Sequence, residues 1–213
     1  MTHDRHKTER SPAHSLTLRE ISSLRNMRLL LSLTILSLLS AVAVAPVPCD
    51  KLLGPLPLTS FDKIIGKWIC LAGTADHPLN LDILKIADSF WIEFLPTTRN
   101  DTAIFTQGNK FGKTCIYSSA NTTIEANTFI IHDRVISTGV FLPTSSEYLV
   151  MSYNNTFGED TYRFLLLLGR RAELGVSEKE MYKRQGECLG LLSPVFMDLE
   201  QELCPDEKKP SSS

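Results

Sequence analysis

Short β-rich runs recur along the chain after residue 66, and polar or glycine-containing segments separate them. Eight strands are expected, over residues 67–73, 89–95, 102–107, 113–118 with an extension to 125, 128–132, 135–142, 148–154 and 162–168. The expected turns lie at 96–98, 108–109, 125–127, 143–146 and 155–160. This even spacing predicts an antiparallel meander. Because only full closure removes the exposed edges of a sheet, an up-and-down barrel is the expected all-β architecture.

One C-terminal α-helix is expected to pack on the barrel wall. Ser177 is the expected N-cap and Glu180 completes a capping box, with Val176 and Met181 at the hydrophobic-staple positions. The apolar stripe that follows comprises Met181, Gln185, Cys188, Leu189 and Leu192. The uninterrupted apolar run over 165–168 predicts a strand buried on both faces, one toward the barrel interior and one beneath this helix.

An almost wholly apolar stretch over 29–45 follows Met27-Arg28 and ends in alternating alanines. Its length falls short of the ~20 residues of a membrane-spanning helix, so it predicts a secretory signal peptide at 27–45, cleaved after Ala43 or Ala45. No membrane insertion is expected after cleavage, and the protein is expected to be secreted. Residues 1–26 are interpreted as an upstream extension of the gene model. A membrane anchor with a cytoplasmic tail is the alternative.

The remaining chain predicts one domain over 46–205 and a disordered tail over 206–213. Loss of residues 1–45 removes six basic and three acidic residues from the totals of 22 and 24, leaving 16 against 21 and a net charge of about −5. Because nucleic-acid binding requires clustered Lys and Arg, this balance excludes nucleic acid as the expected partner.

All five cysteines lie after residue 45, where export would favour disulfides, and their odd number leaves one unpaired. No Cys-x-x-Cys pair or Cys/His ligand spacing is present, so neither a metal site nor a cofactor is expected. Three N-glycosylation motifs begin at Asn100, Asn121 and Asn154, and surface glycans are expected at these positions.

Three local motifs carry a family resemblance. Gly66-Lys67-Trp68 opens the first expected strand, Cys115-Ile116-Tyr117 lies in the fourth, and Gly169-Arg170 with Glu173-Leu174 follows the eighth. Together they resemble the lipocalins over the whole of the exported chain. Within that family the chain is most similar to the α1-acid glycoproteins and the fish saxitoxin- and tetrodotoxin-binding proteins, with apolipoprotein M second.

The resemblance implies structural roles for several residues. Trp68 is expected to close the barrel floor after Gly66, with Arg170 packed across its ring in a cation–π contact. The resemblance also implies two disulfides, Cys49 with Cys188 and Cys115 with Cys204. Cys70 would then be free, which departs from the α1-acid glycoprotein pattern.

Alternation along strands, oriented by the resemblance, gives an expected set of ligand-binding residues inside the barrel. The set comprises Trp68, Cys70, Ala72, Ile92, Phe94, Tyr148, Val150, Ser152, Phe164, Leu166 and Leu168, with His132 as a polar contact near the mouth. Such a lining is mostly apolar with a few polar groups, as small-molecule sites usually are. The alternative is that these side chains simply fill a barrel core.

The resemblance implies a plasma carrier that binds small hydrophobic or amphipathic ligands without catalysis. A first alternative is an apolipoprotein M-like sphingolipid carrier associated with lipoprotein particles. A second is an enzyme that uses the Cys70 thiol, and no base for it can be named from the sequence.

Overall fold

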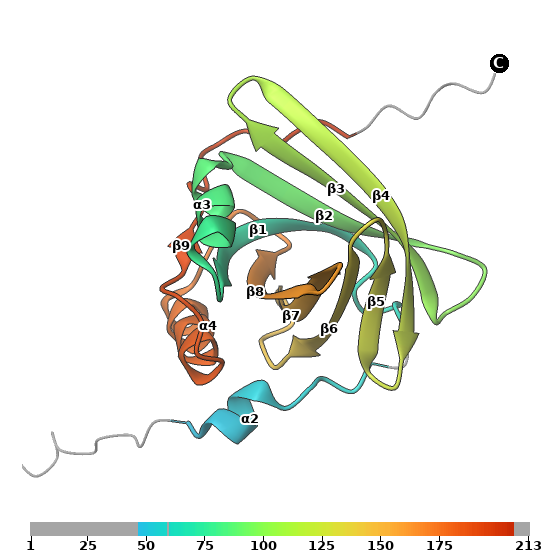
Figure 1. The fold of residues 1–213 in the computed structure, drawn as a ribbon, viewed down its shortest axis with the longest axis horizontal. Coiled ribbons are helices and arrows are strands. Elements are labelled where there is room, and N and C mark those ends of the chain that lie inside the picture. Colours follow the sequence, from blue (N-terminus) through green and yellow to red (C-terminus); the bar gives the residue numbers. More distant parts are fainter. Residues whose placement is uncertain (1–46, 59, 207–213) are drawn as a thin grey trace, which may run out of the picture. The chain divides into compact units, whose positions relative to one another are not determined.

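A computed structural model describes residues 47–58 and 60–206, and these residues form a closed antiparallel barrel (Figure 1). The expected signal peptide, the extension before it and residues 207–213 lie outside the described residues. The barrel strands are β1 (Gly66–Ala75), β2 (Ser89–Pro96), β3 (Thr102–Phe111), β4 (Thr114–Glu125), β5 (Thr128–His132), β6 (Ile136–Leu142), β7 (Tyr148–Phe157) and β8 (Asp160–Gly169). Each strand pairs with the next, and β1 also pairs with β8, which closes the barrel. The expected architecture of eight up-and-down strands with a C-terminal helix is confirmed.

One edge of strand β1 pairs with β8, and the other edge pairs with two different strands. Residues 66–69 pair with β2, whereas Ala72 and Gly73 pair with the short strand β9 (Val195–Phe196). The register of β1 against β8 shifts between Cys70 and Ala72. β9 therefore covers the part of the β1 edge that β2 leaves unpaired.

Several strands are longer than the sequence predicted. The expected turn at 108–109 is wrong, because β3 continues through it to Phe111. Gly108 is required there by packing, since a Cβ atom at this position would lie 2.7 Å from the Trp91 ring. The expected turn at 155–160 begins too early, because β7 runs to Phe157 and only Gly158 and Glu159 connect it to β8.

Helix α4 (Val176–Cys188) does not begin with the expected capping box. Its N-cap is Gly175, and no side chain caps it. Ser177 lies inside the first turn and donates to Glu178 Oε2 at 2.6 Å, while Glu180 pairs with Lys183. Ser177 and Glu180 bond to other side chains and not to the backbone N–H groups of the first turn. The helix therefore begins two residues earlier than predicted.

The structure also contains two helices that the sequence did not predict, α2 (Cys49–Leu53) and α3 (Pro78–Ile86). α3 connects β1 to β2. Pro78 occupies its first turn and His77 Nδ1 accepts a hydrogen bond from the Leu79 backbone N–H at 3.3 Å. This capped start with proline is a recognised initiation signal. No helix in the described ranges is long and apolar enough to cross a membrane.

Two hydrophobic clusters lie on opposite faces of β8. Leu166 and Leu168 belong to the cluster inside the barrel, and Leu165 and Leu167 belong to the cluster outside it. The expectation that this strand is buried on both faces is confirmed. Tyr182 of α4 lies in the outer cluster, and its hydroxyl donates to the Leu165 carbonyl at 2.7 Å. The predicted helix stripe missed Tyr182 because it centred on Met181, which is only half-buried.

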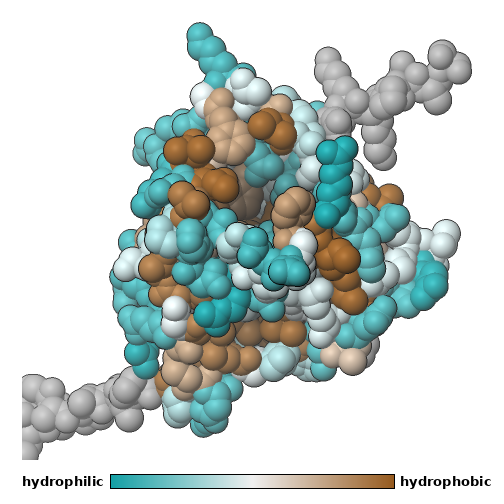
Figure 2. All heavy atoms as spheres, in the orientation of Figure 1, coloured by the Kyte–Doolittle hydropathy of each residue, from teal (hydrophilic) through white to brown (hydrophobic). Residues whose placement is uncertain are grey.

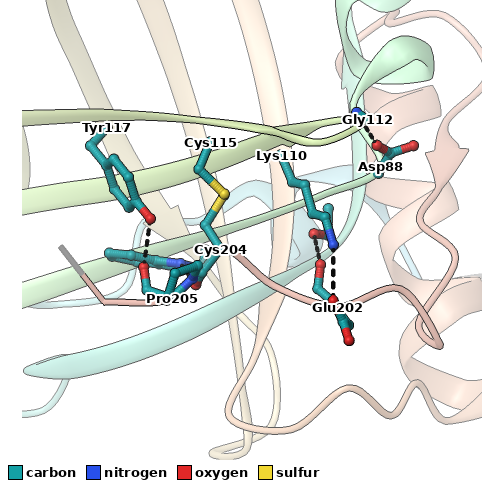
Figure 3. Close-up of a disulfide and its surroundings, with 10 residues drawn as sticks. Asp88, Lys110, Gly112, Cys115, Tyr117, Glu202, Cys204 and Pro205 are labelled. Carbon is teal, nitrogen blue, oxygen red and sulfur yellow. Dashed lines mark hydrogen bonds and ion pairs between the residues drawn. A yellow bond between two sulfur atoms is a disulfide. The ribbon is translucent and has the colours of Figure 1, made fainter.

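The disulfides join Cys49 to Cys188 and Cys115 to Cys204, the pairs that the resemblance implied. The first joins α2 to the end of α4. The second holds the C-terminal segment on β4 (Figure 3). Beside it, the Tyr117 hydroxyl donates to the Pro205 carbonyl at 2.8 Å. Cys70 is the free cysteine of the described residues, and it is buried.

Candidate functional site

The floor of the barrel is built around Trp68. The Arg170 guanidinium carbon lies 3.6 Å from the centroid of the Trp68 ring. Arg170 also donates to the carbonyls of Ile65 at 2.9 Å and Lys67 at 3.2 Å. Burial lowers the pKa of this guanidinium, with the charge of Glu147 acting in the opposite direction. The contact is the one that the resemblance implied between these two side chains, and it closes this end of the barrel.

Most of the expected lining residues do lie inside the barrel. The inner cluster contains Trp68, Cys70, Ile92, Phe94, Leu166 and Leu168. Phe164 stacks on Tyr153, which packs against that cluster, with 5.3 Å between the ring centroids. The expected residues among these come from β1, β2 and β8, so alternation placed them correctly on three strands.

Ala72 was assigned to the wrong face. It lies in the outer cluster with Leu71 because the register of β1 shifts after Cys70. Such an irregularity interrupts the two-residue period of a strand. Counting every second residue from Trp68 therefore no longer identifies the inward-facing residues of β1 beyond Cys70.

The face assigned to Tyr148, Val150 and Ser152 on β7 was also wrong. Val150 belongs to the outer cluster and Tyr148 packs against it, whereas Leu149 and Met151 lie in the inner cluster. Ser152 follows the same alternation as Val150. His132 is exposed at the end of β5, where its ring contacts the Thr123 hydroxyl at 3.1 Å, and it does not line the cavity described next.

A cavity of about 220 Å³ opens at the barrel mouth, where β5 and β7 end. Its apolar lining consists of Ile92, Phe105, Ile131, Val135, Met151 and Leu166, and its polar lining of Gln107, Ser118, Asp133, Ser137, Tyr153 and Asn155. Ser137 donates to the Asn155 side-chain carbonyl at 2.7 Å. Asp133 carries the one charge of this lining. We call this space the mouth cavity.

The sequence identified two of the lining residues, Ile92 and Leu166, and missed the polar ones. Gln107 follows Phe105 by two positions on β3, and Tyr153 follows Met151 by two on β7. Alternation from Phe105 and from Met151 would have found both, but no inward face was expected for β3 and the opposite one was expected for β7. Asp133 and Val135 lie around the β5–β6 turn, where strand alternation carries no information.

Helix α3 lies beside the mouth. Leu81 and Leu84 pack into the inner cluster. Leu79, Ile83 and Ile86 point outward with exposed fractions of 69%, 55% and 66%. The space-filling view shows hydrophobic atoms gathered over α3 and around a hollow beside it (Figure 2). An apolar surface therefore borders the open end of the barrel.

Aromatic rings line part of the mouth cavity and fill the barrel interior beside it. We call this set the aromatic network; it comprises Phe61, Phe94, Phe105, Phe129, Phe141, Tyr153 and Phe164. Neighbouring ring centroids are 4.8 to 6.4 Å apart. Phe94, Phe129 and Phe141 are at most 1% exposed. Of the residues predicted as ligand lining, Phe94 and Phe164 belong to this network.

The Cys70 thiol lies in this packed interior. Its Sγ donates to the Ala72 carbonyl at 3.4 Å, and burial raises its pKa well above the ordinary value. Burial also raises the pKa of Tyr153, and the Cys70 charge adds to that shift. Nucleophilic cysteines have lowered pKa values in electropositive, accessible surroundings, so this geometry favours an inert thiol. In the described part of the chain, no three His, Cys, Asp or Glu side chains form a group able to hold a metal ion.

Comparison with known proteins identifies the fold. No protein-family model matches the chain, and no curated protein matches it in sequence. The siderocalin Ex-FABP superposes with a TM-score of 0.54 at 13% identity, over 64% of this chain and 90% of that one. A dog lipocalin allergen superposes with a TM-score of 0.56 at 16% identity, over 68% of this chain and 99% of that one. The barrel is therefore lipocalin-like in fold.

Proposed function

We propose that this protein is a secreted carrier that binds one small amphipathic molecule reversibly in the mouth cavity. The observation that supports this most directly is the composition of that cavity, which has apolar side chains from Ile92, Met151 and Leu166 beside a polar set that includes Asp133. Small-molecule sites commonly combine an apolar lining with a few polar groups that set orientation.

The dimensions and charge of the cavity limit its ligand. At about 220 Å³ it is smaller than the ~300–1,000 Å³ of most ligand pockets, which favours a compact molecule. Asp133 carries the only charge of the lining, so a ligand with a positive charge or several hydrogen-bond donors is favoured. Burial of its apolar part would contribute roughly 25 cal/mol per Å².

Secretion and glycosylation belong to the same proposal. Two disulfides persist best in an oxidising compartment, and the expected signal peptide would direct the chain there. Asn100, Asn121 and Asn154 are exposed, so each could carry a glycan without displacing core side chains. The burial of Cys70 argues against the alternative of a thiol enzyme.

Native mass spectrometry of the secreted, deglycosylated protein would test the carrier proposal, together with organic extraction of any bound molecule. One small molecule per chain supports it. Asp133→Asn should weaken rebinding of a cationic ligand, whereas Glu159→Gln should not, because Glu159 lies in the β7–β8 turn outside the cavity lining. An empty protein that also fails to bind a panel of amines, steroids and lipids would contradict the proposal.

A further inference from the structure

A second cavity, of about 530 Å³, lies at the opposite end of the barrel. It is lined by residues 56–58, Lys63 and Ile64 of the segment before β1, by 144–146 of the β6–β7 connection, and by Trp68, Tyr148 and Leu149. We call it the floor cavity. It shares no lining residue with the mouth cavity. Its volume falls within the range of ordinary ligand pockets.

The lining of the floor cavity is mainly apolar. Leu56, Leu58, Ile64, Trp68 and Leu149 supply aliphatic and aromatic surface, and residues 144–146 supply three hydroxyl groups. Trp68 is held rigidly, because its indole N–H donates to the Ile64 carbonyl at 2.8 Å and Arg170 stacks on its ring. A preformed apolar wall of this kind reduces the entropy lost when a ligand binds.

Two polar groups of the lining have no partner within the described ranges 47–58 and 60–206. Lys63 carries the only charge of the cavity, is exposed at its edge, and forms no ion pair with a described residue. The Thr144 hydroxyl oxygen is buried and has no hydrogen-bond partner. A buried hydroxyl left unpaired is costly, so a ligand acceptor atom beside it would be favourable.

We propose that the floor cavity binds a single-chain amphiphile with an anionic head group. The chain lies against Ile64, Leu149 and Trp68. The head group accepts a hydrogen bond from Thr144 and is attracted by the Lys63 ammonium. The two cavities then carry side-chain charges of opposite sign, since the mouth cavity has one carboxylate and the floor cavity one ammonium.

The test compares three probes of equal chain length on the whole secreted protein: dodecanoate, dodecanol and dodecylamine. Isothermal titration calorimetry should give one dodecanoate per chain, with dodecylamine bound more weakly. Trp68 fluorescence should change on dodecanoate binding, because this side chain lines the floor cavity and not the mouth cavity. An affinity for dodecylamine equal to or above that for dodecanoate overturns the proposal.

Substitution of Lys63 and Thr144 tests the head-group contacts. Lys63→Gln should weaken dodecanoate by about fivefold or less, as expected for an exposed ion pair, and leave dodecanol unchanged. Thr144→Val removes the hydroxyl at nearly constant volume and should weaken dodecanoate by about threefold to tenfold. Unchanged dodecanoate affinity in both variants overturns the proposal.

A pair of blocking variants separates this proposal from the carrier proposal. Ser146→Phe fills the floor cavity from an exposed loop position, and Ser118→Phe fills the mouth cavity. Circular dichroism checks that both variants fold. Dodecanoate binding lost in Ser146→Phe and kept in Ser118→Phe supports the floor site. The reverse result overturns it while leaving the mouth-cavity carrier intact, and loss in both variants or in neither also overturns it.

Discussion

At the scale of single residues, the Arg170–Trp68 stack is sensitive to a conservative change. Arg170→Lys keeps the charge but loses the planar stack and the paired donation to two carbonyls. The free energy of unfolding should fall by about 1–3 kcal/mol, measured by urea denaturation. Arg171→Lys is the matched control, because Arg171 is the exposed neighbour, and it should change stability by less than about 0.5 kcal/mol. Equal effects would contradict the importance of the stack.

The Cys70 thiol should not react with alkylating reagents in the folded protein. Burial both raises the pKa of its thiol and excludes reagents, so iodoacetamide should label almost no thiol at about pH 8. In concentrated guanidinium chloride, mass spectrometry should show one label per chain, because the other four cysteines are in disulfides. Rapid labelling of the native protein would show that the thiol is accessible. It would then support the alternative of an enzyme that uses the Cys70 thiol.

The sequence predicted the inward positions of β2 and β8, and those of β1 as far as Cys70, because the family resemblance oriented the alternation. On β7, Leu149, Val150 and Met151 are all buried, so the apolar pattern did not distinguish the two faces of the strand and the expected orientation was wrong. The prediction also failed at Ala72, where the irregularity after Cys70 shifts the period.

Asp133 of the mouth cavity was missed because it lies in a turn. Gln107 and Tyr153 lie on strands and were missed because β3 was given no inward face and β7 the wrong one.

At the scale of secondary-structure elements, the packing of β2 against β3 depends on Gly108. A Cβ atom there would lie within 2.8 Å of Trp91 ring atoms. Gly108→Ala should therefore destabilise the protein by about 1–3 kcal/mol in chemical denaturation. The penalty should shrink in a Trp91→Phe background, which removes part of the opposing ring, and an unchanged penalty would exclude this steric cause.

The disulfide between α2 and α4 should stabilise the fold strongly. It links residues separated by 139 positions, and loop-closure entropy increases with that separation. Replacing Cys49 and Cys188 together by Ser should lower the free energy of unfolding by about 2–5 kcal/mol. Differential scanning calorimetry would measure the accompanying fall in Tm, with Lys51→Ser on the exposed face of α2 as the control. A Tm like that of the control would mean that α2 docks without the covalent link.

The elements themselves were largely predictable from the chain. All eight barrel strands were expected, whereas α3 was not, because nine residues between two strands resemble an ordinary loop. The start of α4 was misplaced because Ser177 bonds to Glu178 instead of capping the backbone. Whether a serine hydroxyl bonds to a backbone N–H or to a neighbouring side chain depends on local geometry, which the spacing of residues in the sequence does not specify.

At the scale of the whole molecule, stability should decline at alkaline pH. Burial raises the pKa values of Cys70, Tyr153 and Tyr182 in the folded state. Unfolding exposes groups that lose their protons near their ordinary pKa values of 9.0 for the thiol and 10.0 for the phenols. The unfolded state therefore binds fewer protons above about pH 9, and this contribution to stability is full below that pH and is lost as pH rises.

Urea denaturation at about pH 7.5 and about pH 10.5 would measure this effect. Each group removes about 1.4 kcal/mol per pH unit above its unfolded pKa, so a total loss of at least about 2 kcal/mol is expected. Tyr153→Phe removes one of the three groups and should make the decline shallower. Stability that is constant or rising over this interval would contradict the burial of these side chains.

If the mouth cavity binds a ligand as proposed, the aromatic network affects the rate of binding. A compact molecule that stops at Tyr153 can bind without moving any ring below it. A longer one advances only when rings turn, and because each ring touches the next, one displacement requires another in a close-packed interior. For the proposed carrier, each added carbon of a ligand would therefore slow binding as well as enlarge the apolar surface that is buried.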